Sequence, residues 1–143
     1  MIAVVRIRGT RKLKPKIRKT LEMLNLFKPN HCVVVPETPQ YLGMLSVVKD
    51  YVTFGKIDSD MLFKLLYKKG KKGSRWVREL MEKEKLEEAA RDIFDGKKKI
   101  QDIVDPVFCL HPPRKGYKNI KLSYPAGDLG ARDDIATLLN RMI

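Results

Sequence analysis

Apolar residues in the first 57 positions follow two spacings in alternation. A spacing of two predicts short strands over residues 2–8, 31–35 and 51–54. The first strand is expected to be half buried, with cations on its second face. A spacing of three or four predicts helices over residues 15–24 and 39–48, each beginning with proline. This β-α-β-α-β order, with both helices on one side of the sheet, predicts a small α+β sandwich of the ferredoxin-like kind.

Local capping signals refine these boundaries and extend the helical prediction beyond residue 57. Thr38 is expected to cap the second helix, and Gly55 to end the third strand. A further helix would begin at Asp58 or Ser59 and end at Gly70.

The remaining residues predict two more helical stretches, a loop flanked by strands and a final helix. Ser74 would cap the first stretch, and the second would end at Gly96. Short apolar strands over residues 107–110 and 120–124 would bracket a hairpin-like loop. The last helix would be capped by Asp133.

The 143 residues suit one small domain with a substantial extension, and 43% apolar content is enough for a real core. Neither a repeat nor a low-complexity linker interrupts the chain. We therefore expect a ferredoxin-like module over residues 1–57 and a helical and β-hairpin extension over residues 58–143 packed on it.

The net charge of +13 is concentrated in three places. Residues 1–28 carry nine basic side chains and one acidic, residues 68–73 carry four basic ones, and residues 97–143 carry nine basic and five acidic. The stretches between them are close to neutral. This distribution favours docking onto a polyanion, either nucleic acid or an acidic membrane surface. Apolar runs of only a few residues predict no membrane span.

The candidate nucleic-acid contacts are the side chains of these basic patches, because cations bind phosphates and aromatic rings stack on unpaired bases. They are Arg6, Arg8, Arg11, Lys12, Lys14, Lys16, Arg18 and Lys19, then Lys68, Lys69, Lys71 and Lys72, then Arg114, Lys115, Tyr117 and Lys118. For Tyr117, stacking on a base and packing against the loop remain equally open. Trp76 is interpreted as a core residue rather than a stacking surface.

Catalytic chemistry finds no support. The two histidines have no serine or carboxylate at the spacing of a local triad, and the two cysteines and two histidines show no paired spacing for zinc. Cys32 and Cys109 are expected to be buried free thiols. Gly9 opens a loop that lacks the glycine run and the Lys-Ser/Thr ending of a phosphate-binding loop. We expect no enzyme activity, no metal and no cofactor.

Several segments taken in order resemble one known family. They are Val4-Val5-Arg6-Ile7-Arg8-Gly9, Val33-Val34-Val35-Pro36-Glu37-Thr38-Pro39, Gly43-Met44-Leu45 and Gly127-Asp128-Leu129-Gly130-Ala131-Arg132-Asp133-Asp134. The chain resembles universal large-subunit ribosomal protein thirty in the long form typical of archaea, related to eukaryotic large-subunit protein seven. The resemblance covers essentially the whole chain.

The resemblance implies a structural constituent of the large ribosomal subunit in the cytoplasm. It also implies binding to large-subunit rRNA near 5S rRNA, neighbouring large-subunit ribosomal proteins, and neither catalytic residues nor a small-molecule substrate. The alternative is a non-resident RNA-binding assembly factor. An RNA-modifying enzyme completed by another chain and a membrane-surface protein rank below both.

Overall fold

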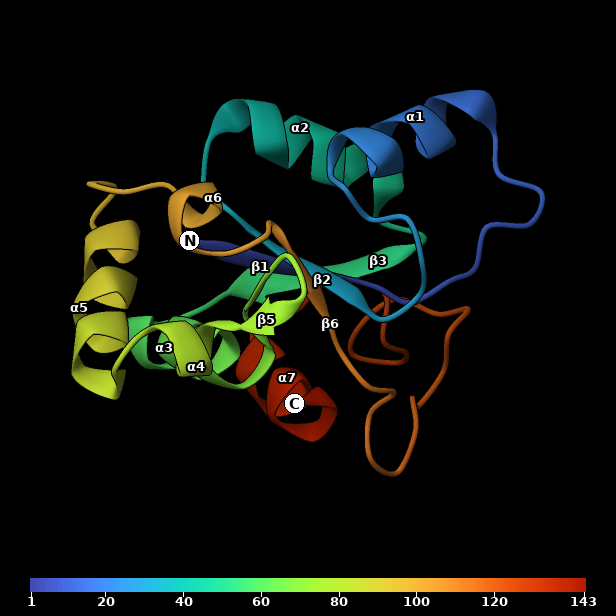
Figure 1. Cartoon of the computed structure of the whole chain (residues 1–143). Helices are drawn as coiled ribbons and strands as arrows, with labels where there is room; N and C mark the ends of the chain where they lie inside the picture. The colour runs from blue at the N-terminus through green and yellow to red at the C-terminus, as the bar shows by residue number, and fades with distance from the viewer.

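The computed structural model describes all residues 1–143, and a five-stranded sheet forms its centre (Figure 1). The strand order is β6-β2-β1-β3-β7; β3 and β7 run parallel, and the other neighbours are antiparallel. The strands are β1 (Ile2–Arg6), β2 (His31–Val35), β3 (Val52–Lys56), β6 (Val107–Cys109) and β7 (Gly130–Ala131). Both edge strands come from the second part of the chain, which therefore completes the sheet. The division at residue 57 stays a prediction.

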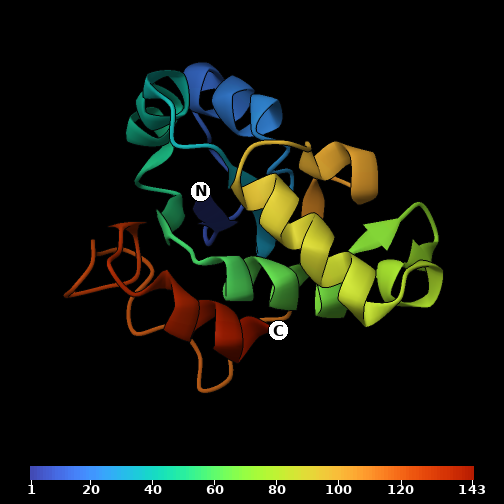
Figure 2. The ribbon, with the colours of Figure 1, turned by 90° about the vertical axis from the view of Figure 1, so that its left-hand side faces the viewer.

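Two helices cover one face of the sheet, as the apolar spacing predicts. They are α1 (Pro15–Met23) and α2 (Pro39–Val48), which Figure 2 shows above the sheet. Leu21 and Leu45 pack there against Val4 and neighbouring strand residues. Thr38 caps α2 by accepting a hydrogen bond from the Tyr41 amide at 3.5 Å.

The opposite face carries a larger core formed by the second part of the chain. Its helices are α3 (Ser59–Lys69), α5 (Lys83–Phe94) and α7 (Ile135–Met142); in Figure 2, α3 and α7 lie below the sheet and α5 runs in front. Ala3 and Val5 of β1 join this second core. All five residues of β1 are consequently buried, and the prediction of a half-buried first strand is wrong.

The α+β ferredoxin-like class is confirmed, but the hairpin lies at a different place from the predicted one. Short strands β4 (Lys71–Lys72) and β5 (Arg75–Trp76) form it, and short helices α4 (Val77–Leu80) and α6 (Ile100–Ile103) follow along the chain. None of the helices is long and apolar enough to cross a membrane.

Two predictions for the second part of the chain are wrong. Ser74 lies in the β4–β5 turn and caps no helix. The strand predicted at 120–124 is irregular: the Lys121 amide donates to the Asn119 side-chain oxygen at 2.8 Å and the Tyr124 amide to the Leu129 carbonyl at 2.9 Å.

The cap of the last helix is Asp134 and not the neighbouring Asp133. Its carboxylate accepts hydrogen bonds from the side chain and the backbone of Thr137, at 3.0 Å for the backbone N–H. These bonds lower the pKa of the Asp134 carboxyl.

Gly55 lies inside β3 and does not end it. A glycine is required at this position because α7 approaches the strand closely there. A Cβ at this position would overlap the Arg132 carbonyl oxygen and lie 2.9 Å from the Ile135 Cβ. We expect Gly55→Ala to lower the free energy of unfolding by about 3 kcal/mol. Urea denaturation checks this value.

Gly43 of α2 provides a control variant for which the free energy of unfolding is expected to rise. A Cβ there has no heavy atom within 4 Å, and alanine favours a helix over glycine. Gly43→Ala should raise the free energy of unfolding by up to about 1 kcal/mol. Equal stability of Gly55→Ala and the unaltered protein would contradict the close packing of β3 against α7.

Candidate nucleic-acid interface

Seven cations gather where β1 ends and α1 begins. They lie on a loop over residues 7–14 and on the first turns of α1, which Pro15 starts. All are exposed except Arg8, which is half-buried and lies 5.1 Å from the centre of the Tyr51 ring. We call this the N-terminal basic surface: Arg8, Arg11, Lys12, Lys14, Lys16, Arg18 and Lys19.

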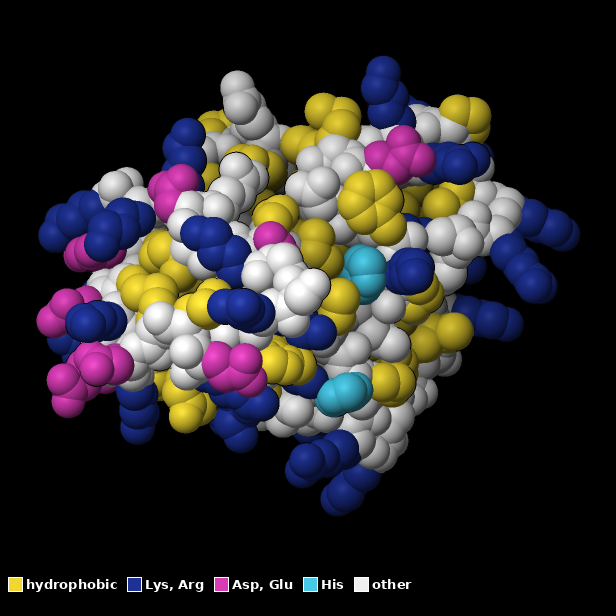
Figure 3. Space-filling view, viewed as in Figure 1, with side chains coloured by type: hydrophobic (Ala, Val, Ile, Leu, Met, Phe, Trp, Pro, Cys, Tyr) yellow, Lys and Arg dark blue, Asp and Glu magenta, His cyan; other side chains and the backbone are white.

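Few carboxylates neutralise the positive charge of this surface. Of the seven cations only Arg18 forms an ion pair, with Glu22 at 3.1 Å. Around α5, in contrast, both signs of charge mix and Arg91 and Lys98 are among the cations that pair with nearby carboxylates. Figure 3 shows the same difference between the left edge, over α5, and the right edge, where Lys and Arg side chains project alone. Unpaired cations remain available to the phosphates of a nucleic acid.

Arg6 is not one of these exposed cations, although the sequence predicted it to be a nucleic-acid contact like them. Its side chain is 2% exposed. Its guanidinium donates to the carbonyls of Leu26 at 2.5 Å, Arg8 at 3.0 Å and Gly9 at 3.1 Å. Burial lowers the pKa of Arg6. Arg6 therefore anchors the loop that carries the N-terminal basic surface.

The second basic patch surrounds the β4–β5 hairpin and the end of α3. Its members are Lys68, Lys69, Lys71 and Lys72, of which Lys69 is half-buried and the others exposed. The Lys71 Nζ lies 4.2 Å and the Arg78 guanidinium 5.2 Å from the centre of the Trp76 ring. Trp76 is half-buried and joins neither core cluster, so its interpretation as a core residue is wrong.

The third basic patch is a loop held in place by α7. The Arg141 guanidinium donates to the Arg114 carbonyl at 2.7 and 2.9 Å and to the Gly116 carbonyl at 2.5 Å. Arg114, Lys115 and Lys118 are exposed on this loop.

Tyr117 of this loop points inward. Its hydroxyl donates to the Asn30 side-chain oxygen at 2.9 Å, its ring packs on the larger core, and burial raises its pKa to about 12. The structure therefore favours packing over base stacking for Tyr117. Because the Asn30 amide donates to the Arg6 carbonyl at 2.7 Å, the loop is tied to the end of β1.

Two exposed apolar residues beside the N-terminal basic surface were not singled out from the sequence. Phe27 is 51% exposed and Met23 is 64% exposed. Phe27 follows buried Leu26 and precedes a Lys-Pro-Asn turn, which is the only signal that could have suggested its exposure. An exposed ring beside cations suits stacking on a base.

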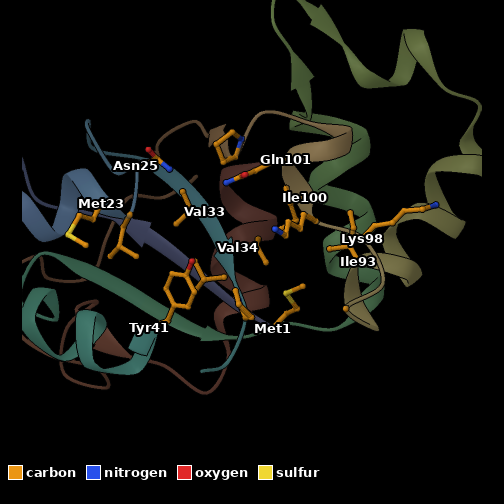
Figure 4. A pocket seen from close by; sticks show the side chains of 16 residues that line it. Met1, Met23, Asn25, Val33, Val34, Tyr41, Ile93, Lys98, Ile100 and Gln101 are labelled. Atoms are coloured by element: carbon orange, nitrogen blue, oxygen red, sulfur yellow. The ribbon is translucent and has the colours of Figure 1, made fainter. Parts of the chain in front are cut away.

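One pocket of the molecule has a mainly apolar wall. It measures about 420 Å³ and lies between α1, β2 and α6 (Figure 4). Met1, Met23, Val33 and Tyr41 contribute to its mainly apolar wall. No carboxylate, histidine or cysteine lines it.

His31 of β2 and Cys109 of β6 are paired on neighbouring strands. The Cys109 Sγ is 3.9 Å from the His31 Nε2. Cys32 is buried as expected, and burial raises its pKa to about 12. Cys109 is exposed because it lies on edge strand β6, so the expectation of a buried thiol is wrong there. No group of three or more His, Cys, Asp or Glu side chains is placed to hold a metal ion.

The chain is similar to proteins of one known family. The family model described as ribosomal protein L30p/L7e matches residues 2–52. Large ribosomal subunit protein uL30 of Archaeoglobus fulgidus is 49% identical, with 99% of both chains covered. The proteins of the same name from Methanothrix thermoacetophila and Methanobrevibacter smithii are 43% and 41% identical, with 99% and 100% of both chains covered. The chain therefore belongs to the ribosomal protein L30p/L7e family.

Proposed function

We propose that this protein is a structural constituent of the large ribosomal subunit that binds large-subunit rRNA. The proposal is supported by the relatives, which are named as large ribosomal subunit proteins and match over nearly the full length of both chains. The match to the family model described as ribosomal protein L30p/L7e supports a structural rather than a catalytic role.

The observation that carries RNA binding is the lack of ion pairs on the N-terminal basic surface. Six of its seven cations have no carboxylate partner. Each cation that neutralises a phosphate releases condensed counterions, and about six such contacts give a steep dependence of affinity on salt. The cations of the β4–β5 hairpin and of the 114–118 loop would add contacts at the edges of the same bound RNA.

The resemblance to the ribosomal family supports a finer placement. The bound region would lie near 5S rRNA, neighbouring large-subunit proteins would share the interface, and the assembled subunit would be cytoplasmic. Protection of rRNA from hydroxyl radicals tests this placement. Protected nucleotides adjoining the 5S rRNA support it, and protection confined to distant segments contradicts it.

Direct binding of the purified chain to RNA tests the function itself. At about 0.15 M salt we expect at least one large-subunit rRNA fragment to bind about a thousandfold tighter than non-specific RNA, within the usual ratio for specific recognition. Equal affinity for large-subunit rRNA, small-subunit rRNA and an unrelated transcript would overturn the proposal.

A further inference from the structure

A pocket of about 310 Å³ opens within the N-terminal basic surface, between the 7–14 loop and α1. Its volume lies within the range of small-molecule sites, about 300–1,000 Å³. Its wall includes the side chains of Arg6, Thr10, Leu13, Arg18, Glu22 and Phe27. We call it the Arg6 pocket.

The Arg6 guanidinium gives this pocket a buried positive charge without a counter-ion. No carboxylate forms an ion pair with Arg6, and its three hydrogen-bond partners are neutral backbone carbonyls. A buried charge without a charged partner is costly, so an anion in the pocket would stabilise it. A guanidinium has five N–H donors, and three of those of Arg6 donate to these carbonyls.

The rest of the pocket does not cancel this charge. Glu22 is the one carboxylate that lines it, and the Arg18 Nε holds that carboxylate at 3.1 Å. The two lining arginines and one lining glutamate leave the pocket with a net charge of +1. The 7–14 loop, which contributes Thr10 and Leu13 to the pocket, also carries exposed Arg11, Lys12 and Lys14.

An exposed aromatic ring lines the same pocket as the Arg6 guanidinium. Phe27 is 51% exposed although it lines the pocket, so its ring is available to a ligand that enters. Half-buried Leu13 adds apolar wall and exposed Thr10 adds a hydroxyl. A phosphate beside a planar base is the ligand that uses a guanidinium and an exposed ring together.

We propose that the Arg6 pocket holds one nucleotide of the bound RNA, with its phosphate towards Arg6 and Arg18 and its base against Phe27. This inference rests on the proposed function, because the nucleotide belongs to the RNA that the protein binds. An acidic protein segment is disfavoured, since it would supply the negative charge but leave the Phe27 ring without a stacking partner.

Nuclear magnetic resonance of the full chain tests the ligand class. Adenosine monophosphate should shift both the Arg6 Nε–H resonance and the Phe27 ring resonances, and inorganic phosphate should shift the Arg6 resonance alone. The proposal is overturned if adenosine monophosphate moves only amide signals of surface lysines. It is also overturned if a hexaglutamate peptide shifts both pocket resonances more strongly than the nucleotide does.

Substitution of Phe27 tests the pocket in RNA binding. Phe27→Ala should raise the Kd for a single-stranded adenine octanucleotide about tenfold, because one stacked base is lost, and should leave the salt dependence unchanged. Phe94→Ala is the matched control, since Phe94 is 40% exposed at the end of α5, away from the pocket. Its Kd should equal that of the unaltered protein.

The outcomes separate this inference from the proposed function. If the unaltered protein binds RNA in a salt-dependent manner and Phe27→Ala binds equally well, the pocket assignment fails and the proposed function stands. If the unaltered protein binds no RNA, both fail.

Discussion

Replacement of Arg11, Lys14, Lys16 and Lys19 by glutamine is expected to weaken binding to large-subunit rRNA about a thousandfold near 0.1 M salt. These cations are exposed and form no ion pair, so each is free to release counterions from a phosphate. The slope of log affinity against log salt should become shallower by about 3 to 4, because each phosphate contact contributes about 0.9. Filter binding over a series of salt concentrations measures both quantities.

A charge-matched control separates local contact from net charge. Glutamine at Lys83, Lys85, Arg91 and Lys97 removes the same charge from exposed positions on and beside α5. Three of these cations already pair with carboxylates, so the affinity for RNA should fall far less. Equal losses in the two variants would show that overall charge, and not the N-terminal basic surface, binds the RNA.

Asp128→Ala is expected to lower the free energy of unfolding by about 3–5 kcal/mol. The Asp128 carboxylate is buried, accepts hydrogen bonds from the amides of Lys118 and Asn119, and forms an ion pair with buried Arg132. Its removal would leave the Arg132 charge buried without a partner and free the loop that ends at Asp128. Urea denaturation measures the loss.

The control for this prediction is Asp133→Ala. Asp133 is an exposed aspartate close to Asp128 in the sequence, and its replacement should change stability by less than about 0.5 kcal/mol. Similar unfolding curves for the two alanine variants would contradict a structural role for the Asp128–Arg132 pair.

The first part of the fold was predictable because its signals are local. The apolar spacing predicted β1, β2, α1 and α2 closely, and the Thr38 cap follows from one residue type at one position. The edge strands β6 and β7 pair with residues tens of positions away, and no local pattern encodes that pairing. Packing of the second part of the chain, which is also long-range, buries the second face of β1 and requires Gly55 inside β3.

The candidate RNA-binding residues likewise include some that the local sequence predicts and others that depend on tertiary contacts. Charge clustering was enough to predict the N-terminal basic surface, because exposed cations need no tertiary contact to be exposed. Arg6 could not be told apart from its neighbours, since its burial depends on the carbonyls of Leu26, Arg8 and Gly9. The exposure of Phe27 depends on the path of the chain between α1 and β2.

Sedimentation of the tagged protein from lysate of its source organism, at rising salt and with the bound RNA sequenced, tests whether the protein is a resident of the large subunit. We expect retention on large ribosomal subunits through moderate salt, with sequence reads concentrated on large-subunit rRNA. Early release from the subunits would favour a non-resident assembly factor. Recovery of no RNA, or of RNA unrelated to the ribosome, would show that the proposed function is wrong.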